Sequence, residues 1–259
     1  MGLADAGFRL VYSAGEAPQP KANLVKADRS QFFSLSNTLS IMSLKLHIDH
    51  LTSPNTRLLQ GWQFDVAAGE ITTLMGPSGC GKSSLLLAIT GLLPDDFSWQ
   101  GRVWLNQREI TTLPTHQRHV GLMFQHDALF AHMNVHDNLL YATPAAPMSE
   151  RKASVRRALA DVELSEAITL FPDQLSGGQR TRIALMRALL ARPEALLLDE
   201  PFSALDAHLR ERVRARVFAM IRQARIPALL VTHDPQDIAS PERVLHWPKA
   251  ATDTTEPHV

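Results

Sequence analysis

Gly76-Pro77-Ser78-Gly79-Cys80-Gly81-Lys82-Ser83 is the stretch that decides the fold of this chain of 259 residues. It matches the pattern G-x-x-x-x-G-K-[ST], in which the backbone N–H groups of a glycine-rich loop surround phosphate oxygens. The apolar, β-branched run 70–75 before it predicts a buried strand, and the run 84–90 after it predicts a helix that ends at Gly91. Strand, loop and helix together predict an α/β fold that binds a nucleoside triphosphate.

The side chains of this loop predict how the phosphates are held. Lys82 brings a full positive charge, and the N-terminus of the following helix adds a partial one. The hydroxyl of Ser83 is placed to bind Mg²⁺. We interpret Cys80 as a small residue tolerated between glycines rather than a catalytic thiol, because the loop uses its backbone there. The predicted nucleotide-binding residues of this stretch are Gly76, Pro77, Ser78, Gly79, Cys80, Gly81, Lys82, Ser83 and Ser84.

Composition narrows the class of partner. The 26 basic and 26 acidic residues balance, so the chain has no broad charge that would attract nucleic acid or an anionic membrane surface. A hydrophobic content of 45% is ample for a buried core. We expect neither a membrane span nor a secretory signal, because no long apolar run is present. The single cysteine excludes an internal disulfide and fits a reducing compartment.

The hydrophobic pattern divides the chain. Residues 1–41 lack a sustained period and predict a poorly ordered extension. We hypothesise that Met42 is the true initiator, because a strand pattern begins beside it, and that 42–259 form one nucleotide-binding domain. Short strands are predicted at about 44–51, 58–66, 101–106 and 120–125. The compact apolar runs 195–198 and 228–231 are typical of a parallel sheet buried on both faces, so the predicted fold class is α/β with a parallel sheet and an antiparallel β layer.

Helices are expected mainly between residues 124 and 195, where a helical subdomain is predicted at about 126–180. Its helices are expected at about 135–141, 150–162 and 176–190, the second with Ser149 as its N-cap. A further helix at about 207–225 carries an apolar face made of Leu209, Val213, Val217, Met220 and Ile221. Its arginines could contact nucleic acid, but Glu211 among them favours a solvated face.

Two carboxylates follow the apolar strand at 195–198. Asp199 and Glu200 are thereby placed at the carboxyl edge of the sheet, where ligands of open α/β folds bind. Asp199 is predicted to hold Mg²⁺ through water, and Glu200 to polarise the attacking water as general base. An acidic pair after a strand is by itself a common loop start, and only the phosphate loop favours the functional interpretation.

The phosphate loop and the two carboxylates are joined by further motifs, and together these resemble the ATP-binding cassette (ABC) family. The run Leu175-Ser176-Gly177-Gly178-Gln179 resembles the family's signature motif and precedes the two carboxylates, as in that family. Gln125 stands where the family has its Q-loop glutamine. Ser203-Ala204-Leu205-Asp206 resembles the D-loop, and Thr232-His233-Asp234 resembles the switch-histidine segment. The motifs cover about 44–244 in family order, so the resemblance implies a P-loop NTPase with an ABC ATPase core.

The resemblance implies an active site shared between two copies of the chain. Ser176, Gly177 and Gly178 begin a helix and form a second anion-binding cup, which in ABC proteins binds the γ-phosphate held by the other subunit. The implied assembly is a homodimer around two ATP molecules. Gln179 and Asp206 are implied at the same nucleotide. His233 is implied to orient the water together with Glu200, and Gln125 to reach the metal bound by Ser83 and Asp199.

A finer resemblance is to ATPase subunits of bacterial importers, of the YnjD-like branch. It rests on the region 113–133, which in such importers receives a helix of the membrane subunit. Leu129, Phe130, Met133 and Val135 would line that groove or, equally well, pack inside the helical subdomain. One departure is that 51–58 contains no aromatic residue for stacking adenine, and Trp62 aligns better with a core strand position. The five histidines between 116 and 136 include the His132/His136 pair, and we favour scattered histidines over a zinc site.

The resemblance implies an ATP- and Mg²⁺-dependent ATPase that drives an importer through two separate permease subunits. It would lie on the cytoplasmic face of the bacterial inner membrane and depend indirectly on a periplasmic substrate-binding protein. Too few residues follow Pro235 for a C-terminal regulatory domain. The alternatives are the ATPase of an exporter or lipid-extraction complex, or a soluble ABC ATPase acting on ribosomes or DNA. The last normally needs fused cassettes or a coiled-coil insertion, and no nucleic-acid partner is expected.

Overall fold

The computed structural model describes residues 43–124 and 128–248. The predictions for 1–41, for Met42 as initiator and for Gln125 therefore fall outside the described residues. An antiparallel sheet comes first, with strand order β2-β1-β4-β5. Its strands are β1 (Ser43–Thr52), β2 (Arg57–Ala67), β4 (Ser98–Leu105) and β5 (Arg108–Glu109). Along β1, buried Leu44, Leu46 and Ile48 alternate with exposed residues, so one face of this sheet packs on a core.

A parallel sheet of order β6-β7-β8-β3-β9 carries the candidate site. Its strands are β3 (Ile71–Met75), β6 (Val120–Met123), β7 (Ala195–Asp199), β8 (Ala228–Thr232) and β9 (Val244–His246). Every residue of β7 and β8 is buried, as the two apolar runs predict. The phosphate loop, Glu200 and His233 follow β3, β7 and β8, which are neighbours in the sheet, so they meet at one edge.

Five α-helices of the described residues complete the fold: α1 (Lys82–Thr90), α2 (Val135–Ala142), α3 (Met148–Asp161), α4 (Gly177–Leu190) and α5 (Ala207–Ala224). Short 3-10 turns cover Thr115–Gln117, Ser165–Ala167, Pro172–Gln174, Pro235–Asp237 and Pro241–Arg243. The prediction of Ser149 as N-cap is wrong. Helix α3 begins earlier because the carbonyl of Pro147 already accepts from the N–H groups of Glu150 and Arg151.

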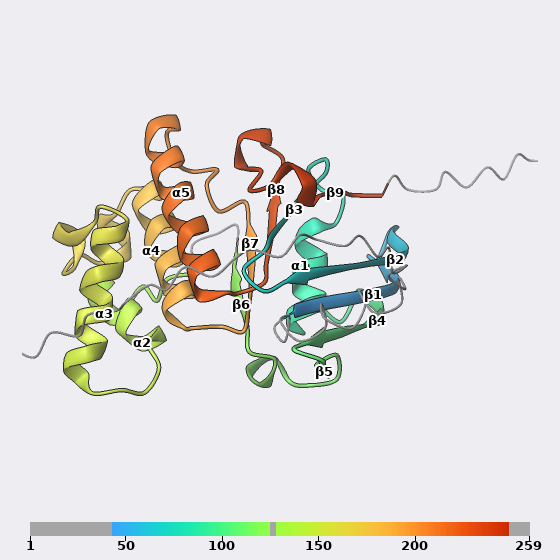
Figure 1. Cartoon of the computed structure of the whole chain (residues 1–259), viewed down its shortest axis with the longest axis horizontal. Helices are drawn as coiled ribbons and strands as arrows, with labels where there is room; N and C mark the ends of the chain where they lie inside the picture. The colour runs from blue at the N-terminus through green and yellow to red at the C-terminus, as the bar shows by residue number, and fades with distance from the viewer. Residues whose placement is uncertain (1–42, 125–127, 249–259) are drawn as a thin grey trace, which may run out of the picture. The chain divides into compact units, whose positions relative to one another are not determined.

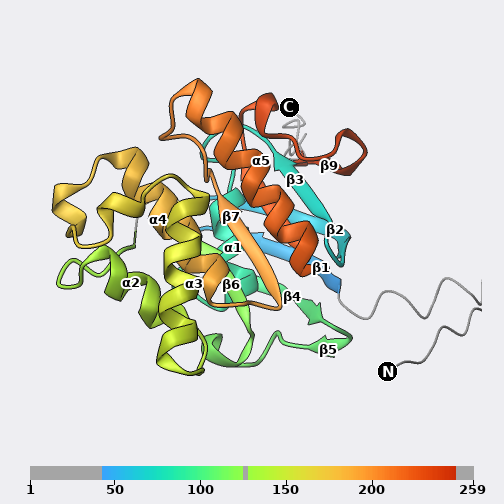
Figure 2. The same ribbon diagram turned by 60° about the vertical axis from the view of Figure 1, so that its left-hand side comes forward.

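The parallel sheet separates two hydrophobic cores. In β7, Leu196 and Leu198 face the core formed with α2, α3, α4 and α5, whereas Ala195 and Leu197 face the core formed with α1 and the antiparallel sheet. Figure 1 shows the parallel strands with α2 to α5 on one side and α1 with the antiparallel sheet on the other, and Figure 2 shows the molecule turned so that the helical side comes forward. Because strand residues alternate between faces, one short strand serves both cores.

The apolar face predicted for α5 is confirmed, since its residues point into the first core. Val213, Val217 and Ile221 are buried in the first core, where Leu209 and Met220 pack against it. The interpretation of its arginines as a solvated face is wrong for Arg210, whose side chain is only 14% exposed and forms ion pairs across the fold. Periodicity predicted the buried stripe but not this polar contact.

Arg118 connects the phosphate-loop helix to the region after it. The residue is buried, and its guanidinium donates to the carbonyls of Leu113, Thr111, Ala88 and Ile89. The last two belong to α1, whose final carbonyls have no partner within the helix. Arg118 therefore closes the C-terminal end of the helix that begins at Lys82.

Candidate functional site

The phosphate loop joins β3 to α1 through glycines that serve different purposes. Gly79 and Gly81 have φ of 76° and 111°, a backbone conformation that favours glycine. Gly76 is required by space, because a Cβ there would lie 2.7 Å from Cβ of Trp247. The indole of Trp247 and the side chain of Leu58 also lie against Gly81. The side chains of Trp247 and Leu58 therefore pack against one side of the loop. The backbone conformation of the loop fits an anion-binding site.

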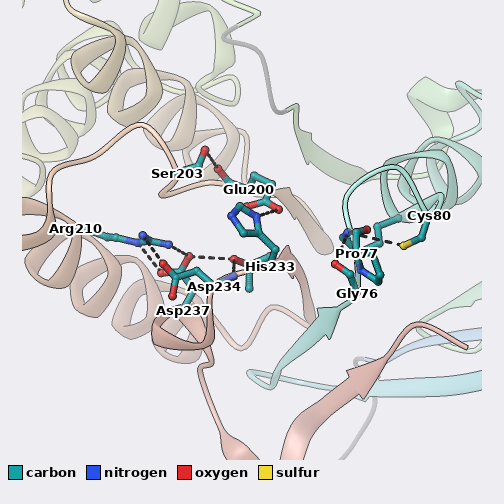
Figure 3. A network of polar contacts seen from close by, with 11 residues as sticks. Gly76, Pro77, Cys80, Glu200, Ser203, Arg210, His233, Asp234 and Asp237 are labelled. Carbon is teal, nitrogen blue, oxygen red and sulfur yellow. Dashed lines mark hydrogen bonds and ion pairs between the residues drawn. The ribbon is translucent and has the colours of Figure 1, made fainter. Parts of the chain in front are cut away.

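Lys82 lies across this loop. It is 6% exposed, and its ammonium group donates to the carbonyl oxygens of Gly76 and Pro77 at 2.8 Å and 2.6 Å. The sulfur of Cys80 lies 3.9 Å from the same nitrogen. Figure 3 shows Gly76, Pro77 and Cys80 in the loop that follows the end of a strand. The cation is thereby held where the sequence predicts the phosphates.

Asp199, at the end of β7, is buried and lies beside Ser83. Burial raises the pKa of its carboxyl above the ordinary value of 3.8, the hydrogen bond with Ser83 lowers it, the charge of Glu200 raises it and that of Lys82 lowers it. A hydroxyl and a carboxylate are hard oxygen ligands of the kind that Mg²⁺ takes. Ser83 and Asp199 therefore fit the predicted metal, whereas Gln125 lies outside the described residues.

Glu200 and His233 contact each other directly, from the loops after β7 and β8. His233 Nδ1 lies 2.7 Å from Glu200 Oε1, and the side chains are 60% and 10% exposed (Figure 3). The other oxygen, Oε2, is buried and has no hydrogen-bond partner among the described residues. Burying a carboxylate oxygen that accepts no hydrogen bond lowers the stability of the fold, unless a bound group donates one to it. An attacking water is the partner that a general base would take.

The backbone of Glu200 is also unusual. Its φ is +49°, a left-handed conformation that is uncommon for a residue with a side chain. The carbonyl of Glu200 accepts from the hydroxyl of Ser203 at 2.9 Å, and its N–H donates to the carbonyl of Val231 at 3.0 Å. These bonds to the next strand and to the following turn hold the conformation, as expected for a strained residue at a functional site.

The start of α4 has the geometry predicted for 176–179. Ser176 is the N-cap, its hydroxyl accepts from the N–H of Gln179 at 3.2 Å, and the Gln179 side chain accepts from the N–H of Ser176 at 2.8 Å. At Gly177 an added Cβ would make only an ordinary contact, 3.9 Å from Nη2 of Arg180. Gly178 is different, because its added Cβ would lie 3.1 Å from the carbonyl oxygen of Ala204. The two glycines therefore have separate roles.

Asp206 caps the next helix. Its carboxylate accepts from the N–H of Leu209 at 3.0 Å at the start of α5. This capping contact could have been predicted from sequence, because aspartate is a preferred N-cap residue. The segment 203–206 thus touches both Glu200, through Ser203, and Gly178, through Ala204.

A second feature is an apolar groove of about 280 Å³ between β6, α2 and α4. Its lining includes Met123, Phe124, Ala128, Phe130, Tyr141 and Arg187. Phe130 and Tyr141 meet edge to face at 5.2 Å, and the Arg187 guanidinium lies 5.1 Å from the Phe130 ring centre. Of the four residues for which the sequence left groove and core equally open, Leu129, Phe130, Met133 and Val135, only Phe130 lines this groove. Val135 is buried in the core, and Leu129 packs against that core.

Two other expectations concern aromatic and histidine side chains. Trp62 is partly buried and packs against the second core, with its ring 6.0 Å from that of Trp247. Within the described residues, no group of three or more His, Cys, Asp or Glu side chains is arranged to hold a metal ion. His136 pairs instead with Asp137, at 2.9 Å.

The sheet, the glycine loop and the acidic strand end together define a P-loop nucleoside triphosphatase. Residues 59–203 match the family model described as ABC transporter, and the chain belongs to this family of ATP-binding proteins that hydrolyse ATP. It is 49% identical, over 75% of this chain and 90% of the relative, to the uncharacterized ABC transporter ATP-binding protein YnjD of Escherichia coli. The predicted family and ABC ATPase fold are therefore confirmed.

Other relatives carry the names of importers. Identity is 40% to the sulfate/thiosulfate import ATP-binding protein CysA of Neisseria meningitidis, over 77% of this chain and 56% of that protein. Identity is 42% to the Fe(3+) ions import ATP-binding protein FbpC of Haemophilus influenzae, over 69% of this chain and 51% of that protein. The chain spans about half the length of these two relatives.

The fold also matches solved structures of the cassette MJ0796. One is described as a dimeric structure of this bacterial ABC transporter cassette, with a TM-score of 0.70 and 26% identity over 79% of this chain and 94% of that one. A second is a dimer in a post-hydrolysis state bound to ADP and Pi, with a TM-score of 0.68 and 27% identity over the same shares.

Proposed function

We propose that this chain is the ATP-hydrolysing subunit of a bacterial ABC importer and acts through separate permease subunits. The observation that carries the proposal is the groove formed by Phe130, Tyr141 and Arg187, an apolar surface on a protein whose relatives include named import ATPases. Exposed apolar grooves of this kind are typical protein interaction sites. The ATPase of an exporter or lipid-extraction complex is the second candidate.

Each residue at the sheet edge has a proposed task in hydrolysis. The loop 76–84 binds the phosphates through its N–H groups, and Lys82 neutralises their charge. Glu200 accepts the proton of the attacking water through Oε2, and His233 orients that water and the γ-phosphate. Ser83 and Asp199, with Gln125, would hold Mg²⁺, which neutralises phosphate charge when bound. The unpartnered Oε2 of Glu200 supports its assignment as base.

We propose a head-to-tail homodimer as the active form. Ser176, Gly177, Gly178 and Gln179 at the start of α4 would bind the γ-phosphate held by the partner copy, since a helix N-terminus attracts anions. The surroundings of Gly177 support this, because an added Cβ there would meet only the end of the Arg180 side chain, at 3.9 Å, and no atom of another element. Asp206 would lie at the same interface. The dimeric cassette structures that this fold matches also favour it.

The groove is proposed to receive a helix of the permease. The exposed rings of Phe130 and Tyr141 offer apolar contact, and Arg187 adds a cation at its wall. No helix in the described ranges is long and apolar enough to cross a bilayer. As part of the importer proposal, the protein would lie on the cytoplasmic face of the inner membrane, held there by its permease, which would receive its cargo from a periplasmic binding protein.

The test is to purify tagged Glu200→Gln protein from native membranes in ATP and to identify what accompanies it. This variant should bind ATP, hydrolyse it at least about 100-fold more slowly and accumulate as dimer. We expect an integral membrane permease to be recovered. The matched control adds Tyr141→Ala, which should lose the permease and keep the dimer.

Three outcomes would redirect the proposal. Recovery of ribosomal or DNA-associated proteins without a membrane subunit would exclude a transporter. Recovery of a permease whose neighbouring genes include no periplasmic binding protein would favour the exporter. If Tyr141→Ala left permease recovery unchanged, the groove would not be the docking site.

A further inference from the structure

Arg210 forms a fork of ion pairs at the start of α5. Its N–H donates to the carbonyl of Asp206, so it lies one turn after the N-cap. Its guanidinium Nε donates to Asp237 Oδ1 at 3.0 Å and Nη2 to Asp237 Oδ2, while Nη1 lies 2.7 Å from Asp234 Oδ2. Figure 3 shows the guanidinium pointing toward both carboxylates, which lie next to each other. Such a two-pronged contact fixes angle as well as distance.

Asp237 is the centre of this cluster. Its side chain is 1% exposed, and it also accepts from the hydroxyl of Thr232 at 3.2 Å, with Arg214 at 3.5 Å. The same Thr232 hydroxyl accepts from the N–H of Asp234 at 3.1 Å. Both residues next to His233 in the chain are therefore tied to Asp237, directly or through Arg210.

The side chain of His233 makes few contacts with the described residues. Its side chain is 60% exposed, and the contact described for it is the one with Glu200. The direction in which the imidazole projects is consequently set by the backbone between Thr232 and Asp234. That backbone is anchored by the Arg210 cluster, which lies on a different element from the general base.

We propose that Arg210 is a positioning residue for ATP hydrolysis, which holds the His233 loop in register with the start of α5. Its guanidinium contacts Asp234 and Asp237, so its proposed role is exerted through the loop and not on the reacting atoms. Asp206, which caps α5, belongs to the segment 203–206 that touches Gly178 and Glu200. Arg210 thus connects the segment next to the proposed dimer interface with the histidine that orients the water. The inference rests on the proposed roles of His233 and Glu200.

A purely structural role would have different consequences. A buried ion pair is weak evidence for stability, although removing one partner leaves an uncompensated charge. A structural residue would lower the amount of folded protein or nucleotide binding in parallel with turnover. A positioning residue lowers turnover alone, and only while His233 is present to be positioned.

The experiment compares Arg210→Gln with the matched control Arg212→Gln. Arg212 lies on the same helix and pairs with Glu163 at 3.0 Å, but both side chains are 52% exposed. Steady-state ATPase rates and ATP affinity are measured for each variant, alone and combined with His233→Gln. Arg210→Lys is included because it retains the charge and is expected to fold, yet cannot form the two-pronged contact.

We expect Arg210→Gln to lower kcat on the order of 10- to 100-fold with ATP affinity nearly unchanged, as misplacement of a reacting group does. Arg210→Lys should show a smaller loss of kcat, and Arg212→Gln none. In the His233→Gln background, Arg210→Gln should add no further loss. An equal loss of kcat in both backgrounds would overturn the proposal while leaving His233 in its role. If His233→Gln alone did not change kcat, the role of His233 would fail as well.

Discussion

At the scale of single residues, the sheet edge keeps a carboxylate in an environment that disfavours its charge. Asp199 is buried, and that burial raises the pKa of its carboxyl, with the charge of Glu200 adding to the effect. Residues kept in such environments at the expense of stability are common at functional sites. The neighbouring Ser83 hydroxyl and Lys82 ammonium offset only part of the cost.

Asp199→Asn should therefore stabilise the nucleotide-free protein at neutral pH, by about 1 kcal/mol. A carboxyl whose pKa is higher in the folded than in the unfolded protein binds protons more tightly when folded. Its contribution to the free energy of unfolding falls as pH rises from the ordinary value of 3.8 through the raised value. The gain from asparagine should be full above this window and disappear below it. Thermal unfolding of both proteins across this pH range is the measurement.

Asp95→Asn is the control, since this aspartate is exposed. It should change stability little at any pH. The same Asp199→Asn protein should lose Mg²⁺-dependent ATPase activity. A wild type more stable than the variant at neutral pH would contradict the account of burial.

At the scale of elements, α1 depends on a residue far from it in sequence. Arg118 supplies donors to the last carbonyls of α1 and to two carbonyls of its own segment. Gly91, which ends the helix in a left-handed conformation, lies directly against this guanidinium. Arg118 thus closes the C-terminal end of the helix, whereas its N-terminal end at Gly81 has no side-chain cap.

Arg118→Ala should lower the free energy of unfolding by about 3 kcal/mol or more, because several buried carbonyls lose their partner. Urea unfolding measures the change. Arg108→Ala is the matched control, since Arg108 is exposed and donates to a single carbonyl, that of Gln117. If both substitutions lowered the free energy of unfolding equally, the buried hydrogen bonds of Arg118 would add no more stability than the exposed one of Arg108.

Helix α4 offers a pair of adjacent glycines in different surroundings. Gly177→Ala should stabilise the isolated protein by up to about 1 kcal/mol, because alanine favours the helix and its Cβ would clash with nothing, the nearest atom being Nη2 of Arg180 at 3.9 Å. Gly178→Ala should not, because its Cβ would press on the Ala204 carbonyl at 3.1 Å. Thermal unfolding of both variants tests the contrast. A stabilising Gly178→Ala would mean that the segment 203–206 moves aside at little cost.

The same elements show how far the sequence predicts the fold. Alternation in β1 and the wholly apolar runs of β7 and β8 predicted both sheets, because strand period and burial are local properties of the chain. The contacts of Arg118, Arg187 and Arg210 could not be predicted, since their partners lie on other elements. For Val135 the sequence left the groove and the helical core equally open, because a short apolar run does not say which neighbour covers it, and the structure places the residue in the core.

At the scale of the whole molecule, the proposed dimer divides each active site between two chains. Each ATP would lie between the phosphate loop of one copy and the start of α4 of the other. Defects in these two places should therefore complement one another when they are carried by different chains, because one site of the mixed dimer is then intact.

Mixing Lys82→Ala with Gly177→Asp, both in the Glu200→Gln background, should restore an ATP-dependent dimer that holds one nucleotide. Each variant alone should remain monomeric, since lysine loss weakens phosphate binding and the added carboxylate repels it. Size-exclusion chromatography with radiolabelled ATP measures both quantities. A mixture that stays monomeric would argue that both motifs serve the same chain's nucleotide.

The tryptophan beneath the phosphate loop gives the molecule an optical reporter of its own. Trp247 is 9% exposed and packs against Gly76 and Gly81. Phosphates bound by this loop would lie close to the indole and change its surroundings, so we expect the fluorescence emission to change in proportion to occupancy. Trp247→Phe should abolish that signal, whereas Trp104→Phe in the antiparallel sheet should leave it. Nucleotide entry could then be followed in stopped flow without a label, separately from the turnover that it precedes.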